Sequence, residues 1–447
     1  MKKRYALFTL FIAIVAIASC AHTNTTSEES LQPMPPKENS LDMRPPLDSL
    51  GRPLPPPEGF EGEMRPPLDS LGRPLPPPKG GHREQNASLL GKVGSAGLLH
   101  IDGNAERVDI TYMSDLADQN VVQQIGGSLE LDNCHIEKLA GNCSNSDASS
   151  FFGINSAVYI AGKGSVMNIA GGDIYTSAKG ANACFAYNGG VLNISKTKIR
   201  CKDNLSRGIH ATGGGEIYAY DLDVATLGNN SSVIATDRGG GKVMVDRGSY
   251  VCKGKDCAVV YSTGDIVVEN ATGESLQGEV CVVEGDNYVK LVNCNMKSGS
   301  SKRGIMILQS GSGDARGKHG RVYIEQGSIE LTNSAAPLVD VPTNATGSVT
   351  ITDASLVIPS KILMRVAYNS RWKTRGGKGN LVLASKHKHT YEGTVIRDAD
   401  CTLNVTIQSG ATWCLTANTT LDTLTVEPGG AVDLNGYKLI TKARNDM

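Results

Sequence analysis

The chain has 447 residues and a formal net charge of −1 at pH 7, so it has no overall electrostatic attraction to nucleic acid or to anionic lipid. Aromatic residues make up only 5% of the sequence, which leaves few platforms on which bases or sugar rings could stack. The 51 glycines are typical of a chain that turns often.

The N-terminus predicts export. Lys2, Lys3 and Arg4 precede an apolar run at residues 6–18 that is too short to span a bilayer comfortably, so we expect residues 1–19 to be a signal peptide. The run ends at Cys20 in the sequence IASC, which resembles the lipobox of bacterial lipoproteins. The resemblance implies acylation of Cys20, by palmitate among other chains, and an anchor in the outer membrane of a Gram-negative bacterium. The alternative is an ordinary cleavable signal peptide.

Residues 20–86 predict a disordered, proline-rich linker. The sequence MRPPLDSLGRPLPPP occurs at 43–57 and again at 64–78. Dense proline favours extended polyproline II, so we expect a stalk; a docking motif for an aromatic-lined groove is the alternative. An acidic cluster at 27–30 resembles the surface-export signal of Bacteroidetes lipoproteins, which implies exposure on the cell surface. The alternative there is a solvated linker.

A three-residue motif of glycine, any residue and an apolar residue recurs from Gly127 to Gly379, with NYV at Asn287 as a variant that lacks the glycine. The apolar positions, spaced 23 to 37 residues apart, are Leu129, Val166, Val191, Ile217, Val243, Ile266, Val289, Val322, Val349 and Leu381. A unit this small cannot bury its own apolar face, so neighbouring copies must stack. With three short strands per repeat, the sequence predicts an all-β, right-handed parallel β-helix of the pectin-lyase-like kind. We expect a cap at 87–126 and coils at 127–399; a β-propeller is the alternative.

Ten cysteines follow Cys20. Cys252 and Cys257 flank the sequence KGKD and could close a small disulfide loop in an oxidising compartment. Most of the others fall in strand positions, where cysteine packs as a small apolar residue, so core thiols are the favoured interpretation. The zinc spacing CxxC is absent, and neither a metal nor a cofactor is predicted.

Three long spacings place insertions at residues 141–150, 310–321 and 371–380. Surface insertions on a regular scaffold are where binding tends to be located. The third is a predicted binding loop for an acidic polysaccharide or another anionic surface, because a tryptophan stands among cations: Arg371, Trp372, Lys373, Arg375 and Lys378. A flexible, solvated loop is the alternative. His387 and His389 follow, but two alternating histidines are a weak signal for a metal.

Residues 400–447 are predicted to form the last coils and a cap. They contain GATWCLT from Gly410 and GGAVDLNG from Gly429. These motifs resemble the end of autotransporter passenger domains of the pertactin type, in which similar coils close a β-helix. A looser resemblance to adhesin-like β-helix proteins of gut bacteria extends over the coils. Autotransporters continue into a translocator barrel whereas this chain stops at Met447, so we expect the anchor at Cys20 instead.

These resemblances imply a surface-anchored, adhesin-like lipoprotein whose β-helix face binds a host glycan, a matrix protein or a neighbouring cell. The rival is a polysaccharide lyase or glycoside hydrolase, since parallel β-helices also carry such enzymes. Their reactions need paired carboxylates, and Asp221 and Asp223 share one face of a strand. No third acid can be placed beside them and the polygalacturonase motifs are absent, so a non-catalytic protein is favoured.

Overall fold

A computed structural model describes residues 97–311 and 314–446. These residues belong to one compact unit, Lys79–Met447. The predicted signal peptide, the lipidation site Cys20 and the proline-rich linker lie outside the described residues, as does the first part of the predicted cap, 87–96.

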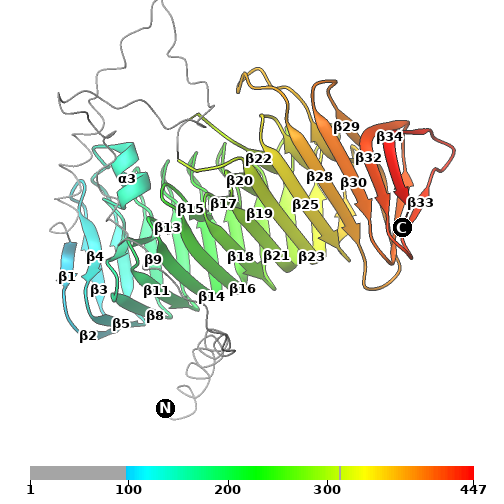
Figure 1. Cartoon of the computed structure of the whole chain (residues 1–447). Coiled ribbons are helices and arrows are strands. Elements are labelled where there is room, and N and C mark those ends of the chain that lie inside the picture. The colour runs from blue at the N-terminus through cyan, green and yellow to red at the C-terminus, as the bar shows by residue number, and fades with distance from the viewer. Residues whose placement is uncertain (1–96, 312–313, 447) are drawn as a thin grey trace, which may run out of the picture. The chain divides into compact units, whose positions relative to one another are not determined.

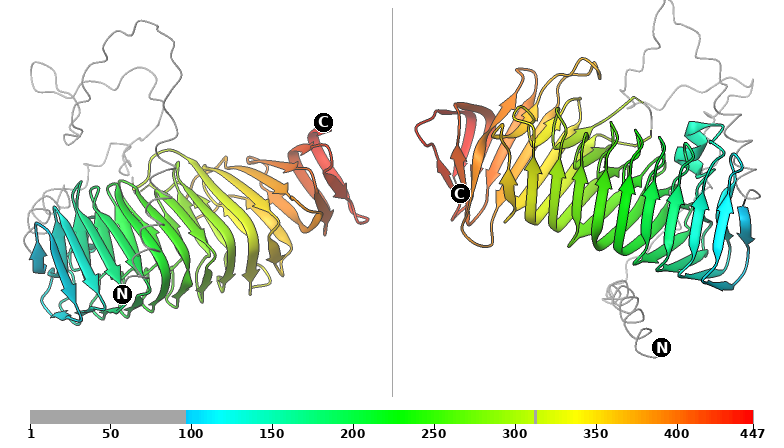
Figure 2. Two further views of the ribbon diagram at one scale, coloured as in Figure 1. Left: turned by 90° about the horizontal axis from the view of Figure 1, so that it is seen from below. Right: turned by 180° about the vertical axis from the view of Figure 1, so that it is seen from behind.

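The described chain winds as a solenoid of parallel strands (Figures 1 and 2). A typical coil gives its first strand to a 14-stranded sheet and its remaining strands to a 20-stranded sheet. Strands of successive coils pair in parallel. One helix, α3 (Ser146–Phe152), stands apart from the strands in the described ranges. The predicted all-β architecture of stacked parallel coils is therefore confirmed.

The 14-stranded sheet forms one side of the solenoid. Its strands are β1 (Gly97–Ile101), β4 (Asn120–Ile125), β7 (Val158–Ala161), β10 (Cys184–Tyr187), β13 (Ile209–Thr212), β15 (Ile234–Thr236), β17 (Val260–Ser262), β20 (Cys281–Glu284), β22 (Ile305–Leu308), β24 (Val339–Val341), β27 (Ile362–Val366), β29 (His389–Arg397), β31 (Ala411–Leu415) and β33 (Ala431–Asp433).

The 20-stranded sheet covers the other sides. Its strands are β2 (Ala105–Val108), β3 (Thr111–Ser114), β5 (Ser128–Asp132), β6 (His135–Lys138), β8 (Val166–Ala170), β9 (Asp173–Thr176), β11 (Val191–Ser195), β12 (Lys198–Cys201), β14 (Gly215–Thr226), β16 (Gly241–Cys252), β18 (Asp265–Glu269), β19 (Thr272–Ser275), β21 (Tyr288–Ser298), β23 (His319–Leu331), β25 (Thr346–Thr352), β26 (Ser355–Val357), β28 (Lys378–Ala384), β30 (Thr402–Ile407), β32 (Thr419–Val426) and β34 (Leu439–Asp446).

One inward column of side chains runs through the coils and accounts for the repeat in the sequence. In register it contains Leu129, Met167, Leu192, Ile217, Val243, Ile266, Val289, Val322, Val349 and Leu381, all of them buried. The prediction is wrong by one residue at Val166 and Val191, which are only half-buried. In those two coils the alternation begins one residue further from the glycine, so Met167 and Leu192 point inward instead.

A sharp corner separates the two strands that a coil gives to the 20-stranded sheet. The corner residue has a positive φ in coil after coil: Asp109, Asn133, Lys196, Asp221, Arg247, Asn270, Asn293, Gln326 and Asp353. Asn and Asp tolerate this left-handed conformation better than most other non-glycine residues. Their side chains also bond along the column, since Asn293 Nδ2 donates to Asn270 Oδ1 at 2.9 Å and Asn133 Nδ2 donates to Asp109 Oδ1 at 2.6 Å.

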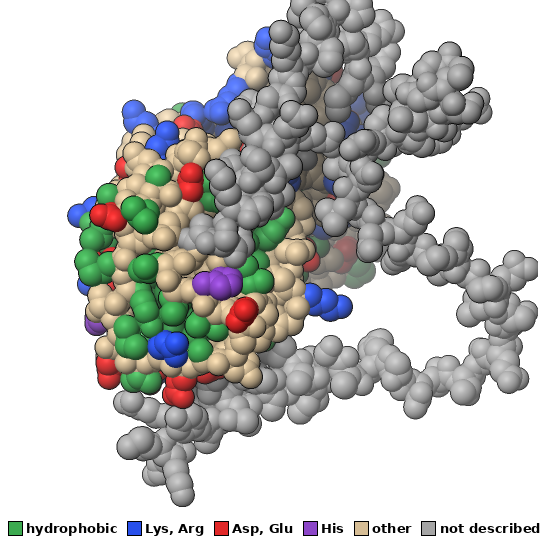
Figure 3. Space-filling model, turned by 90° about the vertical axis from the view of Figure 1, so that its left-hand side faces the viewer, with side chains coloured by type: hydrophobic (Ala, Val, Ile, Leu, Met, Phe, Trp, Pro, Cys, Tyr) green, Lys and Arg blue, Asp and Glu red, His purple; other side chains and the backbone are tan. Residues whose placement is uncertain are grey.

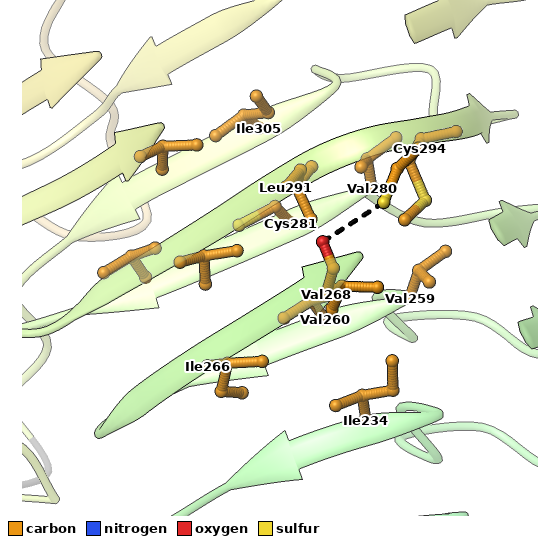
Figure 4. Close-up of a cluster of buried hydrophobic side chains, with 14 of the residues drawn as sticks. Ile234, Val259, Val260, Ile266, Val268, Val280, Cys281, Leu291, Cys294 and Ile305 are labelled. Carbon is orange, nitrogen blue, oxygen red and sulfur yellow. Dashed lines mark hydrogen bonds between the residues drawn. The ribbon is translucent and has the colours of Figure 1, made fainter. Parts of the chain in front are cut away.

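Apolar side chains from both sheets meet inside the coils (Figure 4). Within this core, Cys294 Sγ donates to the Val268 carbonyl at 3.2 Å. All the described cysteines are free thiols and most are buried, so the preferred core-thiol interpretation is confirmed. The disulfide between Cys252 and Cys257 is not formed: Cys252 Sγ donates to the Cys257 carbonyl at 3.3 Å instead.

The first described coil is built like the later ones. Strands β1, β2 and β3 pair in parallel with β4, β5 and β6, so residues 97–126 of the predicted cap are coil strands. Figure 3 looks onto this end, where hydrophobic side chains gather. Leu98, Val108 and Met113 are among the exposed apolar residues there. At the other end the indole of Trp413 is fully buried, and its Nε1 donates to the Gly393 carbonyl at 3.0 Å.

Candidate functional site

The outer side of the 14-stranded sheet is unlike an ordinary solvated sheet face. Its outward side chains form a register column that includes Tyr159, Phe185, His210, Ala235, Val282 and Asp340, none of them more than 4% exposed. Outward residues of the 20-stranded sheet, such as Thr272 and Asn295, are exposed. We call the outer side of the 14-stranded sheet the insertion face, because all three insertions pack on it.

The first insertion supplies helix α3. Its N-cap Asn145 accepts a hydrogen bond from the Ala148 amide at 2.9 Å, and Gly153 ends the helix with a φ of 74°. Ala148 packs with Tyr159 and Phe185 in a hydrophobic cluster of its own, outside the main core. The helix therefore shields the aromatic part of the insertion face from water.

Arginine side chains join the first insertion to the second. The Arg238 guanidinium lies 3.9 Å from the centroid of the Phe151 ring at the end of α3, and its Nη2 is 2.6 Å from Asp314 Oδ1 in the second insertion. Arg207 Nη1 donates to Ser150 Oγ at 3.0 Å. Segments that are far apart in the sequence meet here because the stacked coils bring them to the same face.

Asp237 is the most perturbed acid of this network. Its carboxylate is buried, with Oδ1 accepting from the Arg238 amide at 2.9 Å and Oδ2 lying 3.5 Å from Arg207 Nη2. Burial raises the pKa of Asp237 to about 6; nearby Asp314 and Glu284 add to this rise, and the Arg207 charge opposes it. A carboxyl group with this pKa changes its protonation state near neutral pH.

His210 and Glu284 are further buried polar residues of the insertion face. Glu284 accepts from the Ser310 amide at 3.2 Å and from the Tyr261 hydroxyl at 3.0 Å, which fastens the second insertion. His210 is fully buried with its ring centroid 4.8 Å from that of Phe185, and neither of its ring nitrogens has a hydrogen-bond partner. Burial lowers the pKa of His210, so the imidazole is neutral.

The third insertion carries the predicted binding loop. Trp372 is half-buried and packs against a small apolar cluster of the insertion face that contains Leu308 and Met306. The Arg371 guanidinium lies 5.0 Å from the indole centroid. The tryptophan thus fastens the loop to the solenoid and leaves part of its ring at the surface.

The remaining cations of this loop are exposed. Arg375 lies 4.3 Å from the centroid of the Tyr368 ring, and its Nη1 is 3.4 Å from Asp400 Oδ2. Lys373 is exposed within the loop, and Lys378 is exposed at the start of β28. The structure therefore groups four of the five predicted binding residues in the loop and moves Lys378 onto a strand.

The two acidic residues considered for catalysis are not brought into this face. Both are exposed on β14, in the 20-stranded sheet. Asp221 is the corner residue, with a φ of 54°, so the regular alternation that grouped it with Asp223 is interrupted. Asp223 Oδ2 is 2.5 Å from Arg200 Nη2. These positions give Asp221 a role in the turn and Asp223 a role in a surface ion pair.

In the sequence, Asp237 and Arg238 stand directly before three glycines, a pattern that indicates only a turn. They do precede a turn, since Gly239 and Gly240 both have positive φ. The signal that could have found them is the position of the acids in the coil. Thr212 ends β13, whereas an acid stands at or directly after the end of the first strand in later coils: Asp237 follows β15, and Glu284 ends β20.

The fold is that of a parallel β-solenoid, and comparison with known proteins does not assign it to a family. A scan against protein-family models, a search of curated proteins and a search of solved structures each found no match. No helix within the described ranges is long and apolar enough to cross a bilayer. In the same ranges no three His, Cys, Asp or Glu side chains converge as metal ligands.

Proposed function

We propose that this protein is a surface-anchored, adhesin-like lipoprotein that binds an acidic glycan through its third insertion. In this proposal Cys20 carries the lipid, the proline-rich linker separates the anchor from the solenoid, and the outer membrane of a Gram-negative bacterium is the support. The solenoid is taken to be right-handed, the hand that crossovers between parallel strands adopt, and pectin-lyase-like.

One observation carries the choice of ligand: residues 367–377 contain no acidic side chain and expose Arg371, Lys373 and Arg375 around a fixed Trp372. An arginine binds a carboxylate through two parallel N–H donors, and a lysine adds a point charge. The exposed part of the indole offers a flat apolar surface to a sugar ring. Uronic acids combine a carboxylate with such a ring, so an acidic polysaccharide matches this loop best.

Equilibrium binding tests the proposal. The mature chain carrying Cys20→Ser is expected to bind immobilised polygalacturonate or hyaluronan and not dextran, with an affinity that falls as salt rises. The double variant Arg371→Ala/Lys373→Ala should bind at least about tenfold more weakly. The control Lys386→Ala/Lys388→Ala removes the same charge from another exposed site and should bind like the parent chain. Equal losses of affinity in both double variants would mean that binding depends only on net charge, and would contradict the assignment of the loop as the binding site.

A second candidate function is cleavage of a polysaccharide, as a hydrolase or a lyase. The observation that favours it is Asp237, a buried acid beside Arg207 whose pKa of about 6 suits a proton donor at neutral pH. Release of new chain ends from the bound polysaccharide, lost in Asp237→Asn while binding is retained, would establish this function. Binding without release would exclude it for that polysaccharide.

A further inference from the structure

A different lateral surface of the solenoid carries a column of small polar side chains. The column lies on the strand segments that follow the corner, and its members pair in register: Ser249, Thr272, Asn295, Ser328 and Ser355. The neighbouring column on the same segments holds mostly longer side chains: Val251, Glu274, Lys297, Glu330 and Val357. We call the first column the polar track. The polar track runs along the direction in which the coils stack, and the column of longer side chains stands along one edge of it.

Two hollows lie end to end on this surface. The first has a volume of about 330 Å³ and is lined by both columns from Ser249 to Glu330. The second, of about 300 Å³, begins at Ser355 and extends to Glu392. Ser328 pairs with Ser355, so the hollows occupy successive rungs of the track.

The second hollow arises where the strand arrangement changes. Strand β26 pairs with β23, and the start of β29 pairs with β31. The hollow between β26 and β29 has Leu356 in its lining, and the His389 ring packs 4.5 Å from the Tyr391 ring centroid. Lys361 Nζ and Glu392 Oε2, 2.8 Å apart, form a polar wall. The hollow therefore combines an apolar surface with a charged donor–acceptor pair and with the hydroxyl groups of Ser355 and Thr390.

The charged side chains beside the track form ion pairs with one another. Lys297 Nζ lies 3.4 Å from Glu330 Oε1 and 3.9 Å from Glu274 Oε1. An anionic polymer therefore gains no net attraction here. The track itself carries hydroxyl and amide groups at the strand spacing of about 4.8 Å. Ser328 Oγ donates to Asn295 Oδ1 at 2.8 Å, which leaves the Ser328 oxygen as an acceptor and the Asn295 amide group as a donor toward a ligand.

We propose that the polar track binds a linear, uncharged glycan. The extended chain follows the coils, its hydroxyl groups exchange hydrogen bonds with Ser249, Thr272, Asn295 and Ser328, and one pyranose ring occupies the second hollow against Leu356 and His389. This site is separate from the acidic-glycan loop, because the track lies on the 20-stranded sheet and neither hollow is lined by a residue of the loop.

Calorimetric titration of the mature Cys20→Ser chain tests the proposal, with cellohexaose, xylohexaose and mannohexaose as the probes. At least one of the three is expected to bind. Ser328→Trp places an indole between the two hollows and should weaken that binding by at least about tenfold. Thr272→Trp fills the other part of the track and should do the same. The matched control is Thr111→Trp, at an exposed position of the same register column but outside both hollows.

Two outcomes would overturn the proposal: none of the three hexasaccharides binds, or both track variants bind like the Thr111→Trp control. Circular dichroism of each variant checks that the solenoid is intact. The loop variant Arg371→Ala/Lys373→Ala separates the two proposals. It should lose acidic polysaccharide and retain the neutral hexasaccharide; loss of both ligands would contradict a separate neutral site.

Discussion

Replacing Asp237 by Asn is expected to stabilise the protein at neutral pH. Burial raises the pKa of Asp237 from its ordinary value of 3.8 to about 6. Because a pKa difference of one corresponds to about 1.4 kcal/mol, the native structure disfavours the ionised carboxylate by about 3 kcal/mol relative to the unfolded chain. Because the pKa is raised in the folded protein, the neutral carboxyl stabilises the fold below about pH 4. This stabilisation is lost as pH rises through about 6. Asparagine cannot ionise and avoids the loss.

Urea unfolding of the parent chain and the variant between pH 4 and pH 8 measures this effect. The free energies of unfolding should differ by less than about 1 kcal/mol at pH 4 and by about 3 kcal/mol in favour of Asp237→Asn at pH 7. Asp223→Asn makes the same change in charge at an exposed carboxylate, and it should not reproduce the gain. If Asp237→Asn is the less stable protein at pH 7, the ion pair with Arg207 outweighs the cost of burial and the reasoning is wrong.

Three further predictions concern the coils and the insertions. Arg238→Ala removes the contacts to Phe151 and Asp314, so limited proteolysis should cut residues 309–318 faster than in the parent chain; unchanged cleavage would mean that Arg238 does not hold the insertion. Trp413→Ala should destabilise the protein by about 3–5 kcal/mol, because a fully buried indole is lost, and a cost below about 1 kcal/mol in urea unfolding would contradict its core position. Cys252, whose pKa burial raises to about 12, should react with a thiol reagent at pH 8 only on unfolding; rapid labelling of the native protein would disagree with this burial.

The coils could be predicted from the sequence because each one repeats a local pattern. A glycine turn followed by alternating residues fixes which side chains point inward, and this holds at eight of the ten predicted positions, with Val166 and Val191 displaced by one residue. The corner role of Asp221 was not visible, because its positive φ depends on where the strand bends.

The insertion face could be predicted only in part. The position of each insertion followed from the long spacings, and the cations of the third insertion were read directly from the sequence. The network of Phe151, Arg238 and Asp314 was missed, because its members lie in three different coils and only the stacking brings them within contact distance. No local pattern in a single coil contains that information.

Hydrogen–deuterium exchange with and without polygalacturonate tests the central claim most directly, since it reports where the acidic ligand binds. Bound polysaccharide should slow exchange in residues 367–377, around Trp372, and leave the polar track at Thr272 and Asn295 unchanged. Slowed exchange confined to other segments, or no change anywhere at saturating polysaccharide, would contradict the assignment of the third insertion as the acidic-glycan site.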